Sequence, residues 1–174
     1  MRPGDDASCL NLNRAQQPTL LGVDPAELAR REAFTFQALG KDVDAAAPWK
    51  ALEQELPDGA IPGVADYNSM MWAMRKKIGD TVDYVDQNGK PVAIRLVGAV
   101  ANSILQGHVI IAKQAFTRIY PYEDGHRVFL VDAPQKGRAK AADALTRALS
   151  DSGLELIPTD VRLNRFNAVQ NTYL

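Results

Sequence analysis

A β-hairpin pattern in the middle of the chain constrains the fold more than any other feature. Residues 78–85 and 91–100 are rich in apolar and β-branched residues, and Asn88-Gly89 between them favours the positive backbone angles of a tight hairpin turn. The second run alternates with the period of a half-buried strand, with Arg95 and small residues on its polar side. The apolar side of this strand is predicted to hold Val92, Ile94, Leu96 and Val100.

Further strands are predicted on both sides of the hairpin. Short apolar runs bounded by turn residues favour strands at 61–65, at 109–111 and at 127–131. A helix is expected to end at Tyr120, because Pro121 follows it and cannot continue a helix. Strands and helices mixed in this way predict an α+β fold, in which helices pack on a mixed or antiparallel sheet.

Two helices are predicted in the first third of the chain. Asp24 can accept a hydrogen bond from the backbone of a first helical turn, Pro25 suits the first helical position, and Glu27 is expected to complete a capping box. This helix is expected to run to about Leu39. A second, shorter helix should present one apolar face formed by Trp49, Leu52 and Leu56.

Two more helices are predicted in the C-terminal third. The first has a face of small and apolar residues, which would let it lie close against a sheet, and Gly153 closes it. That face contains Ala141, Ala142, Leu145, Ala148 and Leu149. The last helix covers residues 160–174, and its apolar stripe contains Leu163, Phe166, Val169 and Tyr173.

A segment at 67–77 combines methionine and tryptophan at unusual density. It is predicted to be helical, and its apolar side chains either fill the core or form an exposed contact surface. The core is the favoured interpretation, because apolar stripes at helical spacing usually face inward. The residues concerned are Met70, Met71, Trp72 and Met74.

Length and charge limit the class of protein. The 174 residues suit one domain, 1–174, and the two prolines and two glycines in 57–63 mark the expected seam if that domain has two lobes. The net charge of −1, with acidic and basic residues interleaved, argues against nucleic acid as a partner, because phosphate binding needs a concentrated basic face. No run of about 18 apolar residues is present, so nothing in the chain is expected to span a membrane.

The sequence contains no motif for catalysis or cofactor binding. His108 and His126 have no histidine or cysteine at metal-ligand spacing, which favours structural roles for both. Cys9 has no second cysteine to pair with, and nothing beside it would activate the thiol. Phosphate-loop and dinucleotide glycine patterns are absent from the sequence as well. We therefore expect no catalytic residue, no cofactor and no metal.

The central and terminal segments resemble a known family. The matching stretches are 78–82, 96–100, Asn102-Ser103-Ile104-Leu105-Gln106-Gly107, 109–111, the helix at 116–120, and 125–131. Residues 162–174 resemble the family's helix that approaches the next membrane span, and residues 6–12 resemble the start of its ectodomain. The chain is similar to the extracytoplasmic (periplasmic) domain of FtsX-like ABC transporter permeases, the group that includes MacB-type and lipoprotein-releasing permeases.

The resemblance implies a mechanical role. It implies a porter-like (MacB-like) α+β lobe without catalytic activity, which transmits motion from a separate cytoplasmic ATP-binding subunit and contacts substrate or partner proteins. The implied assembly is a dimeric permease of the inner membrane, with this segment on the periplasmic side and a periplasmic adaptor or a lipoprotein as further partner or substrate. On this interpretation residues 160–174 form a stalk leading towards a membrane span, rather than an ordinary core helix.

The expected contact surface combines exposed aromatic residues, methionine and one loop, because binding patches of such domains are built from these side chains. Its candidate residues are Met71, Trp72 and Tyr122, with Asn102, Ser103, Leu105 and Gln106 from the loop.

Two other functions stay open beside the permease domain. The first is a free-standing secreted or periplasmic ligand-binding protein. The second is a hydrolase that assembles its site from distant residues, which would require a pocket gathering His108 or His126 with carboxylates. The permease interpretation predicts long apolar segments just outside both ends of this stretch, whereas a free-standing protein would have a signal peptide upstream and end near residue 174.

Overall fold

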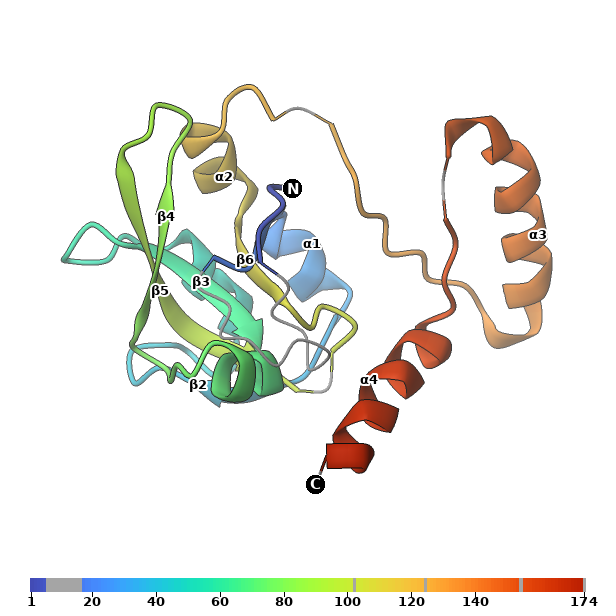
Figure 1. Cartoon of the computed structure of the whole chain (residues 1–174), viewed down its shortest axis with the longest axis horizontal. Coiled ribbons are helices and arrows are strands. Elements are labelled where there is room, and N and C mark those ends of the chain that lie inside the picture. Colours follow the sequence, from blue (N-terminus) through green and yellow to red (C-terminus); the bar gives the residue numbers. More distant parts are fainter. Residues whose placement is uncertain (6–16, 102, 124, 154, 174) are drawn as a thin grey trace.

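The core of the protein is a mixed β-sheet with helices on both faces. The computed structural model describes residues 1–5, 17–101, 103–123, 125–153 and 155–173. Within these residues six strands form one sheet in the order β1-β6-β3-β5-β2, and β4 pairs with β5 (Figure 1). The α+β prediction with a mixed sheet is therefore confirmed.

The strands pair in both directions. β1 is parallel to β6, β3 is parallel to β5, and the pairs β3–β6, β2–β5 and β4–β5 are antiparallel. The strands span Thr19–Val23 (β1), Phe36–Leu39 (β2), Ile61–Asp66 (β3), Thr81–Val85 (β4), Pro91–Val100 (β5) and His108–Ala112 (β6). The predicted hairpin is confirmed as β4 and β5, and the predicted strands at 61–65 and 109–111 are confirmed as β3 and β6.

The expectation that Val100 shares a face with Ile94 is wrong. The β3–β5 register shifts, so that Gly63 lies opposite Leu96 but Val64 lies opposite Gly98. One extra residue on β5 reverses the alternation of its side chains. Ile94 and Leu96 therefore belong to one core cluster, whereas Val100 belongs to the cluster on the other face.

Each face of the sheet has its own apolar core. On one face α2 (Lys113–Ile119) and η2 (Ser69–Ala73), a single π-helical turn, pack against the strands, with Phe116 and Met70 fully or nearly buried. On the other face lie α1 (Pro25–Arg30) and the 3-10 helix η1 (Pro48–Glu53), with Trp49 and Leu52 in the core.

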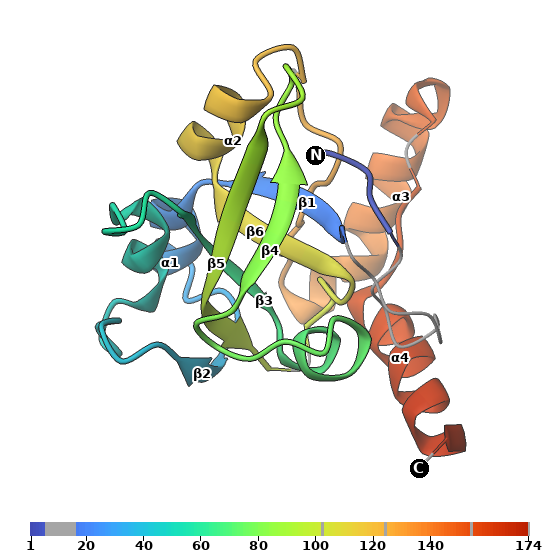
Figure 2. The same ribbon diagram turned by 60° about the vertical axis from the view of Figure 1, so that its left-hand side comes forward.

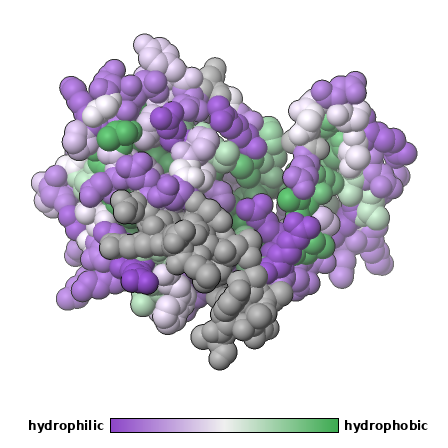
Figure 3. Space-filling view, viewed as in Figure 1, coloured by the Kyte–Doolittle hydropathy of each residue, from purple (hydrophilic) through white to green (hydrophobic). Residues whose placement is uncertain are grey.

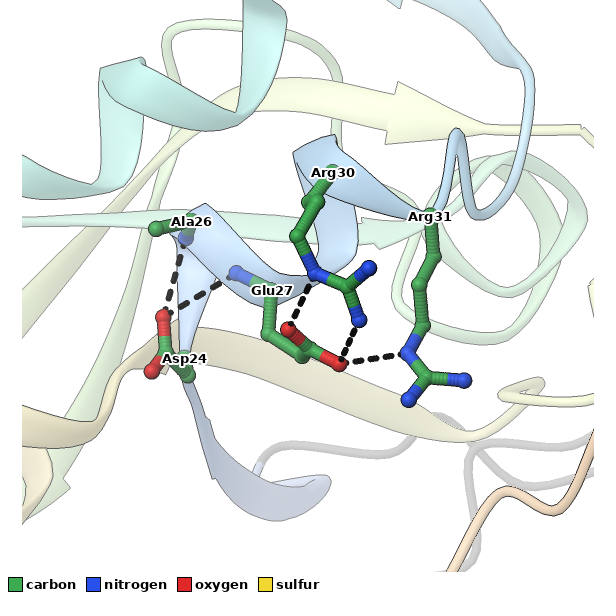
Figure 4. Close-up of polar contacts among 5 residues, drawn as sticks. All are labelled: Asp24, Ala26, Glu27, Arg30 and Arg31. Carbon is green, nitrogen blue, oxygen red and sulfur yellow. Dashed lines mark hydrogen bonds and ion pairs between the residues drawn. The ribbon is translucent and has the colours of Figure 1, made fainter.

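Helix α1 begins as predicted but ends early. Asp24 caps it by accepting hydrogen bonds from the N–H groups of Ala26 and Glu27 at 3.0 and 3.2 Å (Figure 4). Glu27 does not complete a capping box; its carboxylate instead accepts hydrogen bonds from the guanidinium groups of Arg30 and Arg31. The helix ends at Arg30, so the prediction of a helix to Leu39 is wrong.

Tertiary packing explains why the helix stops. Residues 36–39 form β2, which pairs with β5 at an edge of the sheet. The rings of Phe34 and Phe36 lie edge-on to Trp49, with centroids 6.3 and 4.9 Å away. Phe34 adopts a positive φ of 65° to reach this position. Aromatic burial and strand pairing therefore override a helical propensity that is only a weak preference.

Segment 67–77 differs in detail from its predicted structure, whereas the seam expected at 57–63 stays a prediction. Residues 57–60 lead directly into β3, which begins at Ile61, and strands from before and after this segment lie in the same sheet. In 67–77 the structure forms only a short turn around η2, which buries Met70 and Met74 to 1% exposure. Met71 and Trp72 point outward, with exposed fractions of 37% and 70%, so these two side chains lie outside the core.

Two predictions for the segment after α2 are wrong. Residues 127–131 form no strand, and Val128, Phe129, Leu130 and Val131 are all exposed. Helix α3 (Arg138–Ala148) and the 3-10 turn η4 (Ser150–Ser152) form as expected, with Gly153 in a left-handed conformation. However, α3 buries none of its residues and does not lie against the sheet.

The chain then returns to the body through the last helix. α4 (Thr159–Tyr173) lies beside the body and extends away from it at its end (Figures 1 and 2). Its residue Phe166 is 6% exposed, and Leu163 is half-buried. The side chains of Val169 and Tyr173 lie outside the described residues, as do Cys9 and residues 6–12. Among the helices of the described residues, none has the length and apolar character needed to cross a membrane.

Candidate functional site

A cleft separates the body of the protein from α4. Its volume is about 390 Å³. The body side is lined by Gly4, Asp5, Thr19, Gln106, Gly107 and His108. The opposite side consists of Ile157, Arg162, Arg165 and Phe166. The space-filling view shows a hollow between the body and the C-terminal segment, with hydrophobic residues gathered around part of it (Figure 3).

A buried carboxylate positions the loop on the body side. Asp66, at the end of β3, is completely buried and accepts hydrogen bonds from the backbone N–H groups of Asn68, Ser69 and Ser103, at 3.1, 3.2 and 2.9 Å. The Ser69 hydroxyl oxygen accepts a hydrogen bond from the N–H of Gly107 at 2.8 Å. The loop is thus attached to β3 at one end and to η2 at the other, which holds Gln106, directly before Gly107, against the cleft.

Gln106 is the most unusual polar residue of the cleft. Its side chain is buried, with an exposed fraction of 3% for the residue, and its Oε1 atom has no hydrogen-bond partner among the described residues. A buried acceptor that has lost water without gaining a donor is unfavourable, and such groups in native proteins usually serve a purpose. Gln106 therefore marks the cleft as a place where a ligand's donor could bind.

Helix α4 contributes two guanidinium groups. Arg162 and Arg165 are one helical turn apart and so lie on one side of the helix. The Arg162 guanidinium lies 5.8 Å from the centroid of the Phe166 ring, a cation–π contact that helps to orient it. Its Nε atom is buried without a hydrogen-bond partner, and in the described part of the chain no carboxylate forms an ion pair with either arginine.

His108 and Asp5 line the body side together with Thr19. Nδ1 of His108 lies 2.8 Å from the carbonyl oxygen of Gln106 and 3.2 Å from that of Leu105. Because carbonyl oxygens only accept, Nδ1 carries the proton and donates. The Asp5 carboxylate accepts a hydrogen bond from the N–H of Gln17 at 2.9 Å. Thr19 lies directly opposite His108 in the parallel β1–β6 pair.

A buried tyrosine holds the start of β1 in place. The Tyr84 hydroxyl donates to the carbonyl oxygen of Pro18 at 2.8 Å, and Pro18 immediately precedes Thr19. Burial raises the pKa of Tyr84 above its ordinary value, so this hydroxyl keeps its proton and remains a donor. Tyr84 of β4 therefore holds the start of β1, at the edge of the sheet that lines the cleft, in place.

Only some of the candidate residues predicted from the sequence lie at the cleft. Ser103 and Leu105 are buried at 2% and 5% exposure and hold the loop, whereas Gln106 reaches the cleft. Trp72 and Tyr122 are exposed but line no part of the cleft. Asn102 lies outside the described residues, and Met71 is exposed next to Trp72. Of the stalk residues, Phe166 lines the cleft.

Sequence reasoning missed Asp66, Arg162 and Arg165 as parts of the site. One signal was available for Asp66, because an aspartate that ends an otherwise apolar strand usually accepts backbone hydrogen bonds. The two arginines had no such signal, since their distance from the loop depends on how the chain returns after α3. His126 lies on the exposed segment, where its ring contacts that of Phe129.

Comparisons with known proteins and the search for metal ligands both gave negative results. Neither the models of protein families nor the curated proteins include a match to this chain. Within the described ranges, no group of three or more histidine, cysteine, aspartate or glutamate side chains is arranged to hold a metal ion.

Proposed function

We propose that this chain is the extracytoplasmic domain of an FtsX-like ABC transporter permease, a porter-like lobe that transmits motion and performs no catalysis itself. One observation carries the proposal. The two sharpest parts of the sequence resemblance, the loop at 103–107 and the last helix, are far apart in the sequence but form opposite walls of the same cleft. A domain that passes helix movement on to a binding surface needs a contact of this kind.

The construction of the two walls supports this role. The loop is hydrogen-bonded to the sheet through Asp66 and Ser69, so it moves with the body. Phe166 of helix α4 is buried and lines the cleft opposite the loop. A continuous helix is a suitable lever, because its backbone hydrogen bonds all run along its own axis. Displacement of α4 would therefore open or close the cleft.

The proposal includes the assembly in which the domain works. The ATP-binding subunit lies in the cytoplasm and acts through the membrane part of a dimeric permease, and the domain faces the periplasm. A periplasmic adaptor or a lipoprotein is the expected protein partner. The exposed side chains of Met71, Trp72 and Tyr122 are the proposed contact surface for it.

The first test is the reading frame of the parent gene on both sides of this segment. A span of about 20 apolar residues at each side is expected for a membrane-anchored domain. A stop codon directly after Leu174 together with a cleavable signal upstream would overturn the permease proposal.

The lever is tested by distance measurements in the membrane-embedded parent protein with its ATPase. In a Cys9→Ser background, spin labels at Asn164→Cys on α4 and Lys113→Cys on the body should change their distance when ATP and vanadate are added. The control pair Lys50→Cys and Lys113→Cys lies entirely on the body and should keep its distance. An unchanged distance for the first pair would exclude the lever.

A second candidate is a free-standing ligand-binding protein, which the cleft with its unpaired polar atoms also favours. A hydrolase has less support. A catalytic histidine is normally oriented by a carboxylate at Nδ1, whereas Nδ1 of His108 donates to backbone carbonyl groups of the loop.

A further inference from the structure

Two buried polar atoms of the cleft have no hydrogen-bond partner among the described residues, and one of them is an acceptor whereas the other is a donor. Oε1 of Gln106 lacks a donor, and Nε of Arg162 lacks an acceptor, among the described residues. These two atoms come from opposite walls of the same cleft. We propose that the cleft binds a small carboxylate that carries a neighbouring N–H group, the chemistry shared by an N-acyl amino acid and the C-terminal end of a peptide.

The carboxylate follows from the arginines. Two guanidinium groups line the cleft against the single carboxylate of Asp5, which already accepts a hydrogen bond from the Gln17 backbone. A guanidinium presents its N–H groups in a planar fork that matches a carboxylate, and such charge-assisted pairs are stronger than neutral hydrogen bonds. Arg162 and Arg165 are therefore the binding site for the anionic end of the ligand.

The N–H group follows from Gln106. Its buried Oε1 atom can only accept, so the ligand group facing it must be a donor. A free fatty acid or acetate would leave this acceptor unpaired, whereas an amide N–H next to a carboxylate would satisfy both walls at once. Gln106 thus selects for the donor and the arginines select for the charge.

The size and the apolar lining define the rest of the ligand. A cleft of about 390 Å³ lies at the small end of the range for ligand pockets. Phe166 and Ile157 supply apolar surface. Gly107, which also lines the cleft, has a φ of 81°, a conformation that favours glycine. A single apolar side chain next to the carboxylate fits these features.

The test is a titration of the ¹⁵N-labelled chain followed by backbone amide chemical shifts. N-acetyl-L-leucine is expected to shift the amides of Gln106, Gly107 and Phe166 in a saturable manner. N-acetyl-L-leucinamide, which lacks the charge, and acetate, which lacks the N–H group, should each bind about tenfold more weakly or worse. Equal affinity for the acid and its amide would overturn the proposal, and so would an absence of saturable shifts at these residues.

Variants locate the two recognition groups. Arg162→Gln should weaken N-acetyl-L-leucine about tenfold, and Gln106→Met, which removes the acceptor but keeps the length, about threefold to tenfold. Arg147→Gln on the exposed part of α3 is the matched control and should leave the affinity unchanged. An equal loss in the control would contradict the assignment. The comparison of acid and amide on the unmodified chain decides the question if a variant fails to fold.

A peptide ending in leucine with a free carboxyl group distinguishes the two sources of this chemistry. Binding at least as tight as that of N-acetyl-L-leucine assigns the cleft to peptide ends, whereas weaker binding assigns it to small N-acyl amino acids. The inference does not depend on the transport role, because these titrations use the isolated chain and no ATPase.

Discussion

The backbone N–H of Ser103 donates a hydrogen bond of 2.9 Å to the Asp66 carboxylate, across 37 positions of sequence. Through this bond the end of the central strand β3 determines where the loop carrying Gln106 lies. The same carboxylate also accepts from the start of the turn after β3, so one buried group organises two connections. The cleft is therefore supported by the core of the sheet and not only by its surface loops.

Removal of this carboxylate should strongly destabilise the protein. Asp66→Ala leaves two buried N–H groups and one half-buried N–H group without an acceptor and should lower the free energy of unfolding by about 3–5 kcal/mol. Asp66→Asn keeps one acceptor and should cost less, although its amide would face the Ser103 donor. Urea denaturation measures the free energy of unfolding of both variants, and Asp42→Ala, at an exposed position, is the control. A change below about 1 kcal/mol for Asp66→Ala would contradict the role of the carboxylate.

The two tryptophans should respond very differently to truncation. Trp49 is 3% exposed and its indole N–H donates to the Ala33 carbonyl oxygen at 3.1 Å, so Trp49→Ala should cost about 3–5 kcal/mol. Trp72 is 70% exposed, and Trp72→Ala should change stability by no more than about 0.5 kcal/mol. Denaturation curves of the two variants provide the comparison. A large loss for Trp72→Ala would place this side chain in the core after all.

The carboxyl group of Glu27 should titrate at unusually low pH. Hydrogen bonds from Arg30 and then Arg31 lower its pKa from the ordinary 4.5 to about 2 (Figure 4). Because the folded pKa lies below the unfolded one, the stabilising contribution is present above about pH 4.5 and is lost as the pH falls towards 2.

NMR titration of the Glu27 side chain measures this pKa directly. Arg30→Gln should move it upward, whereas the distant Arg147→Gln should leave it where it is. An ordinary pKa in the unmodified chain would show that the carboxylate is not held by the two arginines in solution.

A methyl group at Gly22 should disturb the packing of α2 on the sheet. A Cβ atom there would lie 2.7 Å from Cβ of Phe116, which is 5% exposed and cannot easily move. Gly22→Ala should therefore cost about 1–3 kcal/mol through overpacking. Gly137→Ala is the control, since a Cβ atom meets nothing within 4 Å there and the φ of −106° suits any residue. Thermal unfolding of both variants tests the difference, and equal stability would contradict this close packing.

Local signals predicted the parts of the fold whose structure depends on neighbours in sequence. The hairpin β4–β5 follows from period-two alternation and from Asn88-Gly89, and the start of α1 follows from Asp24 and Pro25. These patterns succeed because the turn and the cap are made by residues within a few positions of one another. The loop residue Gln106 was likewise found from the sequence, although its buried, unpaired amide oxygen was not.

Where prediction failed, contacts between distant residues had decided the outcome. Phe36 leaves the expected helix because Trp49 and β5 offer it a half-buried position, and Val100 changes face because β3 imposes a register shift on β5. The apolar run at 127–131 forms no strand and stays exposed. For Phe36 and Val100 the free energy of burial and strand pairing exceeds the local preference, which amounts to a few tenths of a kcal/mol, or about 1 at most, per residue.

By itself the sequence determined the class of fold, the hairpin, the caps and the near balance of charge, because these depend on local backbone chemistry and composition. Only the tertiary structure decided which face each side chain occupies and brought Arg162 and Arg165 opposite Gln106. These segments are far apart in the sequence, and no local pattern indicates that they lie opposite each other. Their arrangement depends on the path of the chain after α3, which brings α4 beside the body. Phe166 is buried there, and removing its apolar ring from water lowers the free energy.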